Sequence, residues 1–392
     1  MKIGAVICEY NPFHLGHAYQ LREMKKRGAV IAVMSGSFTQ RGDAAVLSKY
    51  DRAEIAVRCG ADLVLELPFP YSSASAEVFG GAGVRIIHLL GLADELCFGS
   101  ETGKSDALTA LSERLSAPGF REALSAHLAQ SRAFSYRTSM ARVYRAYYGE
   151  DFPSVGSNDI LALSYLSALR TLGSDITPVA LERRGERYNG EGEGFASATT
   201  VRALLRTADW DAVARCTPAE TGEALRRAAR VGEIADTEKL FTLFAALVRT
   251  RPEECLAGLY DVPADLAARL YKYGRRSGSG EEFLSLVASR NDSPSRVRRA
   301  VLAALMNVKR EDVGDVPYTA VLAANETGRT ILARLRKTSE IPIVTKPADA
   351  GRYGEAVLRA AALCANADSV WELLCDAPRA GNAMMKEKPR ML

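Results

Sequence analysis

The sequence has no long apolar run and few residues of the kinds that build metal or disulfide sites. No segment approaches about 18 consecutive apolar residues, the length that a membrane-spanning helix needs. The seven cysteines form no C-x-x-C pair, and there are only four histidines. No metal site is therefore expected, and the cysteines are predicted to be reduced core residues. The first residues have the pattern of a strand rather than of a secretion signal, so we expect a cytoplasmic protein with no membrane partner.

Length and composition are typical of a globular protein with more than one core. The chain has 392 residues, of which 47% are hydrophobic and 25% are charged. Such a chain is too long for one small domain and can bury two substantial cores. The net charge of +4 allows a nucleic-acid partner but does not require one, because the distribution of charge matters more than its sum.

Short apolar runs alternate with amphipathic stretches through the first half of the chain. The runs cover residues 2–8, 30–34, 62–67, 95–98 and 176–181. Strands that alternate with helices in this way form β-α-β units around a parallel sheet. Ligands on such sheets bind beyond the carboxyl ends of the strands, near the point where the strand order reverses. The polar turns that follow these runs are therefore expected to converge on one crevice.

The same pattern predicts how the chain is organised. We expect a Rossmann-like α/β domain with a parallel sheet over residues 1–214, in which residues 104–172 form a mostly helical insertion. Residues 215–392 are expected to form a mostly α-helical C-terminal domain, with one possible strand at 341–345. The predicted fold class is thus α/β, followed by a helical second half.

Two histidines stand where the first apolar run gives way to a helical pattern. Apolar residues recur at helical spacing from Ala18 onward, so a helix is predicted to begin at His14 and His17. The first N–H groups of a helix are unpaired and its dipole is positive there, so this end stabilises an anion, and Gly16 lets the backbone approach it. Two imidazolium groups would stabilise the charge that develops as pyrophosphate leaves a nucleotide. A metal site, or two satisfied polar residues, is the plainer alternative.

A second polar motif opens a later helix. Residues 195–202 contain S-A-T-T-V-R, in which Ser197 or Thr199 can cap a helix. Arg202 lies one turn further on, where its planar fork of donors can reach a triphosphate. On its own, this motif would indicate only a capped helix with a surface arginine.

Together these motifs resemble the HxGH and S-x-T-x-x-R signatures of the nucleotidyltransferase superfamily. The blocks E-Y-N-P-F-H, M-S-G-S-F-T-Q-R-G, G-A-D-L-V-L-E-L-P-F and C-F-G-S-E narrow the resemblance to the tRNA(Met) cytidine acetate ligases. The resemblance implies that ATP and acetate give acetyl-adenylate and pyrophosphate, and that the acetyl group passes to N4 of the wobble cytidine of elongator tRNA(Met). It also implies Mg2+ bound with ATP. No protein partner is inferred.

The resemblance further assigns an ATP site, in which His14 and His17 are expected to be catalytic. The ATP-binding residues that it implies are Ile7, Cys8, Glu9, Tyr10, Asn11, Pro12, Phe13, His14, Leu15, Gly16, His17, Ala18, Tyr19, Gln20, Gly99, Asn158, Arg183, Arg184, Ser197, Thr199 and Arg202. Whether Ser35, Arg41 and Lys49 also contact phosphates stays open.

The second half contains a basic stretch with interleaved tyrosines. Residues 269–299 hold eight Lys or Arg against three acidic residues. Such a local excess of positive charge is what phosphate contacts need, although a solvated helix face would explain it equally well. The candidates for tRNA binding are Arg275, Arg276, Arg296, Arg298 and Arg299.

Two alternatives of different kinds remain at this point. The shared signatures also suit an adenylyltransferase or cytidylyltransferase that joins a small phosphate ester to a nucleotide. Such an enzyme needs no basic helical half. The other alternative is an RNA-binding protein that keeps a degenerate nucleotide fold as a scaffold, but the intact His14, Gly16, His17 and Arg202 argue against it.

Overall fold

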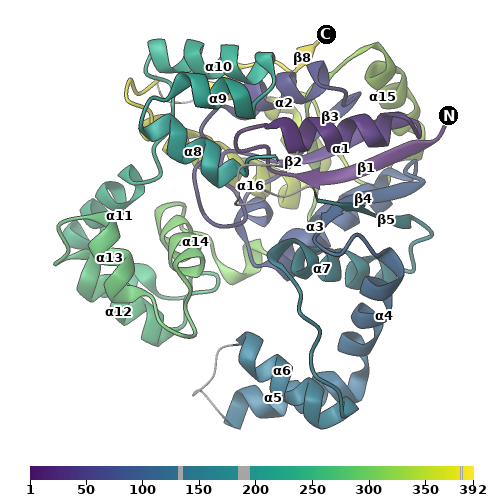
Figure 1. The fold of residues 1–392 in the computed structure, drawn as a ribbon. Helices are drawn as coiled ribbons and strands as arrows, with labels where there is room; N and C mark the ends of the chain where they lie inside the picture. The colour runs from purple at the N-terminus through teal and green to yellow at the C-terminus, as the bar shows by residue number, and fades with distance from the viewer. Residues whose placement is uncertain (131–135, 184–194, 380, 382) are drawn as a thin grey trace.

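The fold is built on a mixed sheet with the strand order β5-β4-β1-β2-β3-β6-β7, in which β8 pairs with β6 (Figure 1). A computed structural model describes residues 1–130, 136–183, 195–379, 381 and 383–392. The strands are β1 (Ile3–Cys8), β2 (Ala29–Ser35), β3 (Leu63–Leu67), β4 (Glu95–Ser100), β5 (Thr177–Glu182), β6 (Thr319–Ala324), β7 (Ile343–Val344) and β8 (Arg390–Met391).

The first five strands form the parallel sheet that the sequence predicts. Neighbouring strands all run in the same direction, and the order 3-2-1-4-5 is that of the first five strands of the Rossmann order 3-2-1-4-5-6. Strand β1 is buried on both faces, because Ile3, Ala5 and Ile7 belong to one hydrophobic core while Val6 and Cys8 belong to the other. Burial on both sides explains why these strands have nearly continuous apolar runs.

The C-terminal half adds strands to this same sheet. Strand β6 pairs antiparallel with β3, and β7 and β8 pair parallel with β6. The possible strand at 341–345 is confirmed as the two residues of β7, whereas β6 was not predicted, because half of its residues are alanine and alanine has little preference for strands. The boundary near residue 214 stays a prediction, and the sheet takes strands from both sides of it.

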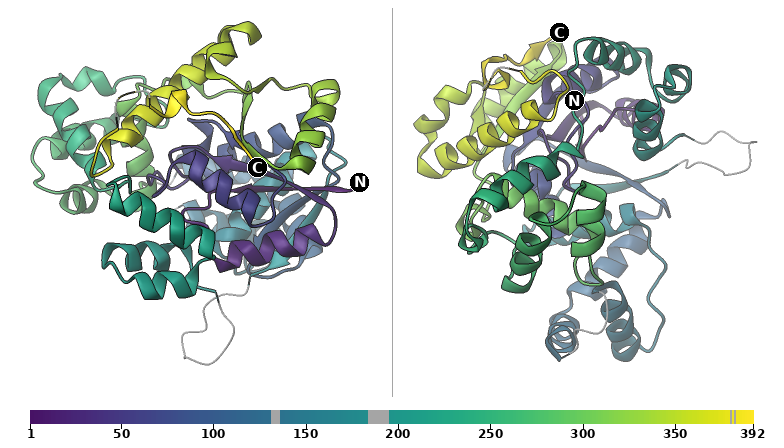
Figure 2. Two further views of the ribbon diagram at one scale, coloured as in Figure 1. Left: turned by 90° about the horizontal axis from the view of Figure 1, so that it is seen from above. Right: turned by 90° about the vertical axis from the view of Figure 1, so that its left-hand side faces the viewer.

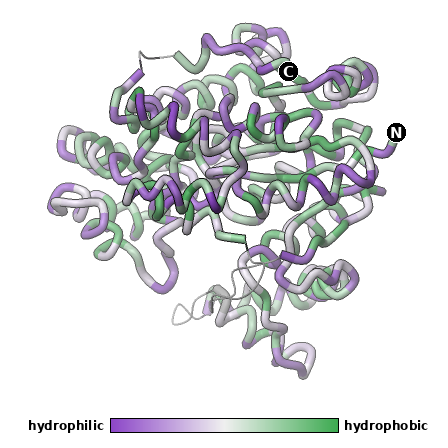
Figure 3. The backbone as a smooth tube through the Cα atoms, turned by 45° about the horizontal axis from the view of Figure 1, so that its top comes forward, coloured by the Kyte–Doolittle hydropathy of each residue, from purple (hydrophilic) through white to green (hydrophobic). Residues whose placement is uncertain are grey.

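Helices cover both faces of the sheet, as the views in Figures 1 and 2 show. One core contains residues of α1, α2, α8 to α14 and α16, and the other contains residues of α3 to α7 and α15. The tube in Figure 3 alternates purple with green along the coils at the surface of the molecule, the pattern of helices with one polar and one apolar face. Residues 104–172, which the sequence predicts to be a helical insertion, contain the helices α4 to α7. None of the helices in the described part of the chain is long and apolar enough to cross a bilayer.

The helices of the first half are α1 (Leu15–Lys25), α2 (Lys49–Arg58), α3 (Ala76–Leu90), α4 (Ser105–Ser116), α5 (Pro118–Gln130), α6 (Tyr136–Tyr148), α7 (Ser157–Thr171) and α8 (Ala198–Arg206). The second half contains α9 (Trp210–Cys216), α10 (Ala219–Arg230), α11 (Lys239–Thr250), α12 (Ala264–Gly274), α13 (Gly280–Val287), α14 (Pro294–Leu305), α15 (Glu326–Thr338) and α16 (Glu355–Leu373).

A buried ion cluster fastens α16 to the sheet. The Nζ atom of Lys49 lies 2.9 Å from Oε1 of Glu66 and 2.7 Å from Oδ2 of Asp368, and the other Asp368 oxygen accepts a hydrogen bond from Ser37. Lys49 also donates to Oε2 of Glu66, so its three N–H groups are all used. The ammonium group of Lys49, whose contact with a phosphate the sequence left open, is thus buried between two carboxylates.

Replacing this lysine should cost much of the protein's stability. We expect Lys49→Ala to lower the free energy of unfolding by about 3 to 5 kcal/mol, because it leaves two buried carboxylates without a cation. Urea denaturation followed by circular dichroism measures the change. Lys26→Ala, which removes an exposed pair with Glu23, serves as the control and should cost less than about 1 kcal/mol. An equally small effect of Lys49→Ala would contradict the role given to the cluster.

Candidate active site

A cavity of about 370 Å³ opens at the carboxyl ends of β1 and β4, where the strand order reverses. The predicted site residues that line it are Ile7, Cys8, Glu9, Asn11, His14, Gly16, His17, Tyr19, Gln20, Gly99, Asn158, Arg183, Ser197, Thr199 and Arg202. The predicted residues that do not line it are Tyr10, Pro12, Phe13, Leu15 and Ala18. Arg184 lies outside the described residues.

The two histidines lie at the N-terminus of α1, and their rings pack against each other. His14 is the N-cap residue, and its Nδ1 accepts the N–H of Gly16 at 3.1 Å. The backbone N–H of His14 in turn donates to Nδ1 of His17 at 3.3 Å, and the two rings stack with centroids 3.7 Å apart. A Cβ atom on Gly16 would lie 2.9 Å from the ring of His14. The glycine is thus required by the packed imidazole as well as by any approaching ligand.

Both imidazoles are neutral near pH 7 in this arrangement. Burial lowers the pKa of His14 to about 4, with a further contribution from the charge of Arg183. Burial, His14 and Arg183 lower the pKa of His17 well below its ordinary value. Because Nδ1 of each ring accepts a backbone N–H, the ring proton lies on Nε2. The expected imidazolium pair is therefore not the state of the free protein, in which the two rings are neutral donors.

The S-x-T-x-x-R motif meets the histidine loop at the cavity wall. Ser197 is the N-cap of α8, as predicted, and accepts the N–H of Thr200 at 3.2 Å. Arg202 donates to the carbonyl of Asn11 at 2.8 Å and to the hydroxyl of Thr199 at 3.2 Å. These contacts hold the guanidinium group beside the N-terminus of α1.

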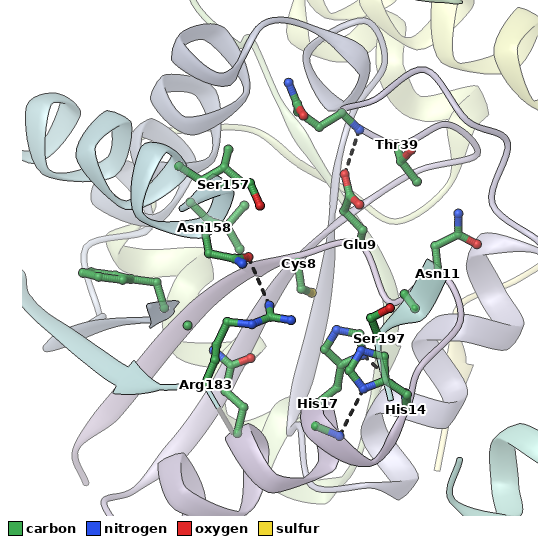
Figure 4. A pocket seen from close by; sticks show the side chains of 18 of the residues that line it. Cys8, Glu9, Asn11, His14, His17, Thr39, Ser157, Asn158, Arg183 and Ser197 are labelled. Carbon is green, nitrogen blue, oxygen red and sulfur yellow. Dashed lines mark hydrogen bonds between the residues drawn. The ribbon is translucent and has the colours of Figure 1, made fainter. Parts of the chain in front are cut away.

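A third group of residues forms the wall near β4 and α7 (Figure 4). Arg183 donates to Oδ1 of Asn158 at 3.0 Å, and Nδ2 of Asn158 donates to Glu101 at 2.6 Å. The Glu101 carboxylate also accepts the backbone N–H groups of Asn158 and Asp159, so it occupies the N-terminus of α7. The structure thus brings Asn158 and Arg183 together with Gly99, as expected. The role of Glu101 was missed, although the C-F-G-S-E block contains it.

The segment at residues 38–43 forms a wall that sequence reasoning left undecided. Thr39, Gln40, Arg41 and Asp43 line the cavity, whereas Ser35 is fully buried away from it. The backbone N–H of Gln40 donates to Oε1 of Glu9 at 2.8 Å. A single antiparallel β-bridge between residues 38 and 44 closes this loop. Such a contact depends on the tertiary fold, so local sequence patterns do not predict it.

Two of the tRNA-binding candidates hold this loop in place. Arg298 forms an ion pair with Asp43 at 2.9 Å, and Arg299 donates to the carbonyl of Gln40 at 3.4 Å. Gly42 has a φ of +78°, and a Cβ atom there would lie 2.8 Å from Cβ of Arg298. Helix α14 therefore packs directly on the cavity loop. Changing Arg298 or Arg299 would disturb the cavity as well as any RNA contact.

Two further candidates have internal partners. Arg275 donates to the carbonyl of Val248 at 2.8 Å, and Arg296 bridges Asp261 and Asp292 at 2.7 and 2.9 Å. The buried carboxylate of Asp292 explains why an arginine is needed beside it. The exposed basic side chains of this stretch that have no hydrogen bond or ion pair to other described residues are Lys272, Arg276 and Arg290.

Fold and cavity together define a nucleotidyltransferase of the Rossmann-like class, and the family model described as HIGH Nucleotidyl Transferase matches residues 1–384. The tRNA(Met) cytidine acetate ligase of Thermoanaerobacter sp. is 33% identical over 361 residues, which cover 88% of this chain and 89% of that protein. The protein of the same name from Acetivibrio thermocellus is 32% identical over 380 residues, 92% of this chain and 91% of its own. The chain belongs to the tRNA(Met) cytidine acetate ligase family.

A solved structure agrees with this assignment. The crystal structure of Thermotoga maritima TmcAL bound with alpha-thio ATP superposes with a TM-score of 0.91, covers all of both chains and is 28% identical in sequence. The resemblance found from the motifs is thereby confirmed, and so is the α/β fold that it implied.

The protonation of the histidine pair can be measured directly. In the ligand-free protein with ¹⁵N-labelled histidine, we expect the His14 ring to carry its proton on Nε2 at pH 7 and to titrate near pH 4. The spectrum of His14→Gln identifies the resonances. A ring that is already protonated at pH 6 would contradict the neutral pair.

The lowered pKa of His14 also predicts how the stability of the protein depends on pH. Histidine in an unfolded chain has a pKa near 6.5, whereas the pKa of His14 in the folded protein is about 4. Between these two pH values His14 is protonated in the unfolded state and neutral in the folded state. The free energy of unfolding should therefore fall by roughly 2 to 3 kcal/mol as the pH is lowered through this window. Urea denaturation of His14→Gln should show a shallower fall.

Proposed function

We propose that the protein activates acetate with ATP and transfers the acetyl group to N4 of the wobble cytidine of elongator tRNA(Met). The observation that carries the proposal is the neutral His14 and His17 pair at the N-terminus of α1, in a cavity that both signature motifs line. The names of the relatives support the choice of tRNA and acetate as substrates, and the bound alpha-thio ATP of the similar structure supports ATP.

In the first step, an acetate oxygen attacks the α-phosphorus of ATP in line, and the bond to the leaving pyrophosphate breaks. The Nε2–H groups of His14 and His17 are fixed donors for the charge that develops on the phosphate oxygens. Because their geometry is set by backbone hydrogen bonds, they need not reorganise during the reaction. Arg202, held by Asn11 and Thr199, adds a cation beside the same helix end.

We propose that Mg2+ enters the site with ATP. No group of three His, Cys, Asp or Glu side chains in the described residues could hold a metal ion by itself. Mg2+ usually keeps several waters and binds through phosphate oxygens with one or two carboxylates. When bound, it would neutralise charge on the departing pyrophosphate.

In the second step, the cytosine amine attacks the acetyl carbonyl of acetyl-adenylate, and AMP leaves. The base has to be splayed from its anticodon stack to reach the cavity. An exocyclic amine conjugated with the ring is a poor nucleophile, and a mixed anhydride with AMP compensates by offering a good leaving group. This demand is the chemical reason to consume ATP.

The tRNA is proposed to lie along the helices of the second half. Lys272 and Arg276 on or beside α12, together with Arg290 before α14, are exposed cations that form no ion pair with the other described residues. Because α14 packs on the cavity loop through Arg298 and Arg299, an RNA held by these helices would lie next to the cavity. Figure 1 shows α11 to α14 as one helical group at the side of the sheet.

The central test follows label from radioactive acetate into purified elongator tRNA(Met). We expect label in the tRNA only when ATP is present, and His17→Ala should reduce it by at least about 100-fold because a donor to the developing charge is lost. Lys337→Ala, on the distant α15, is the control variant. If acetate is not transferred and a small phosphate ester releases pyrophosphate instead, the protein is an adenylyltransferase or cytidylyltransferase.

The proposed RNA surface predicts a salt-dependent defect. Charge reversal of Arg276 and Arg290 to Glu should weaken tRNA binding by roughly tenfold or more and reduce the salt slope by about 2, since each phosphate contact contributes about one unit. Acetate activation in the absence of tRNA should be retained. Filter binding at several salt concentrations measures the change, with Arg334→Glu on α15 as the matched control. Equal losses in both variants would place the RNA elsewhere.

A further inference from the structure

Acetyl transfer to the cytidine amine, the second step of the proposed function, releases a proton. A group in the cavity has to accept this proton, and the identity of that group rests on the proposed function. When N4 attacks the acetyl carbonyl, a C–N bond forms and the C–O bond to AMP breaks. AMP leaves with the electron pair of the C–O bond, and the nitrogen loses one proton to become a neutral amide. A positioned base that takes this proton would speed the step.

The histidines are poor candidates for this base. Nδ1 of His14 and Nδ1 of His17 already accept backbone N–H groups, and each neutral ring carries its proton on Nε2. Both rings therefore present donors to the cavity, which suits them to phosphate oxygens.

Three carboxylates in the described lining remain, from Glu9, Asp43 and Glu182. Asp43 is paired with Arg298 at 2.9 Å, so one of its carboxylate oxygens already has a partner. Glu182 is exposed at the end of β5, at the rim of the cavity. Glu9 follows β1 directly and is the carboxylate at the base of the crevice.

The position of Glu9 is set by its neighbours. Arg52 donates to its carbonyl at 2.6 Å, and the N–H of Gln40 donates to its Oε1 at 2.8 Å. No second donor among the described residues contacts this carboxylate. In Figure 4 the Glu9 side chain points toward the segment of Thr39, away from the stacked histidines. Burial, with a smaller contribution from Asp43, raises the pKa of Glu9, which favours it as a proton acceptor near neutral pH.

We propose that Glu9 accepts the proton from N4 of cytidine during acetyl transfer. The cavity is then divided between its two steps. The N-terminus of α1, with His14 and His17, serves phosphate chemistry, and the Glu9 carboxylate at the other side serves the incoming amine. Gln40 fixes one oxygen of Glu9 and leaves the other available to the substrate.

The test separates the two half-reactions in Glu9→Gln, which keeps an acceptor for the Gln40 N–H but cannot take a proton. Acetate-dependent exchange of labelled pyrophosphate into ATP measures activation, and single-turnover transfer from preformed acetyl-adenylate to tRNA measures the second step. We expect exchange to stay within about tenfold of wild type and transfer to fall by about 10² to 10⁴. Added formate should partly restore transfer in Glu9→Ala, because a small carboxylate can enter the space left by the side chain. Glu113→Gln on α4 controls for the substitution.

Other outcomes would overturn the proposal. If exchange and transfer fall together in Glu9→Gln, or if the variant needs a higher Mg2+ concentration, Glu9 positions the nucleotide or its metal instead. If transfer is unaffected, or if Glu182→Gln causes the transfer defect, Glu9 is not the base. Absence of acetate-dependent exchange in the wild-type protein is a different result, because it would refute the proposed function itself.

Discussion

The frame behind the cavity depends on one buried guanidinium group, that of Arg52, which joins the ends of β1 and β2. Its N–H groups donate to the carbonyls of Glu9, Ser35, Gly36 and Leu47. The carbonyls of Glu9, Ser35 and Gly36 follow the last residues that β1 and β2 pair, Cys8 and Met34, and a buried carbonyl without a donor is costly. Arg52 supplies those donors. Burial lowers its pKa to about 10, so the group remains charged at neutral pH.

The loop that contains His14, Gly16 and His17 follows β1 and leads into α1. The N-terminus of α1 would leave unpaired N–H groups, and two of the acceptors that satisfy such groups are imidazole Nδ1 atoms. The same hydrogen bonds therefore cap the helix and set the protonation of the rings. Because each Nδ1 accepts a backbone N–H, the proton of each neutral ring lies on Nε2. The spacing of His14, Gly16 and His17 follows from this geometry: the glycine leaves room for the first ring, and the second ring stacks on it.

Local patterns predicted the parts of the molecule whose structure is decided locally. The apolar runs predicted five strands and the parallel sheet, and the motifs at His14 and Ser197 marked helix starts. The missed parts are tertiary. Strand β6 exists because it pairs with β3, and the role of Lys49 depends on Asp368, which is 319 residues away. The basic stretch was visible in the sequence, but its internal ion pairs required knowing which carboxylates fold beside it.

The two halves of the chain meet at the loop of residues 38–43, which lines the cavity. Arg299 of α14 donates a hydrogen bond to the carbonyl of Gln40. The backbone N–H of Gln40 in turn donates to the carboxylate of Glu9, which follows β1. Arg298 secures the next turn through Asp43, and Gly42 allows the close approach that these contacts need. A carboxylate that lines the cavity is thus connected to a helix of the basic half through one residue, Gln40. The described residues that line the cavity all belong to the first half of the chain, but the loop of residues 38–43 among them is held in place by a helix of the second half, so the shape of the cavity depends on both halves.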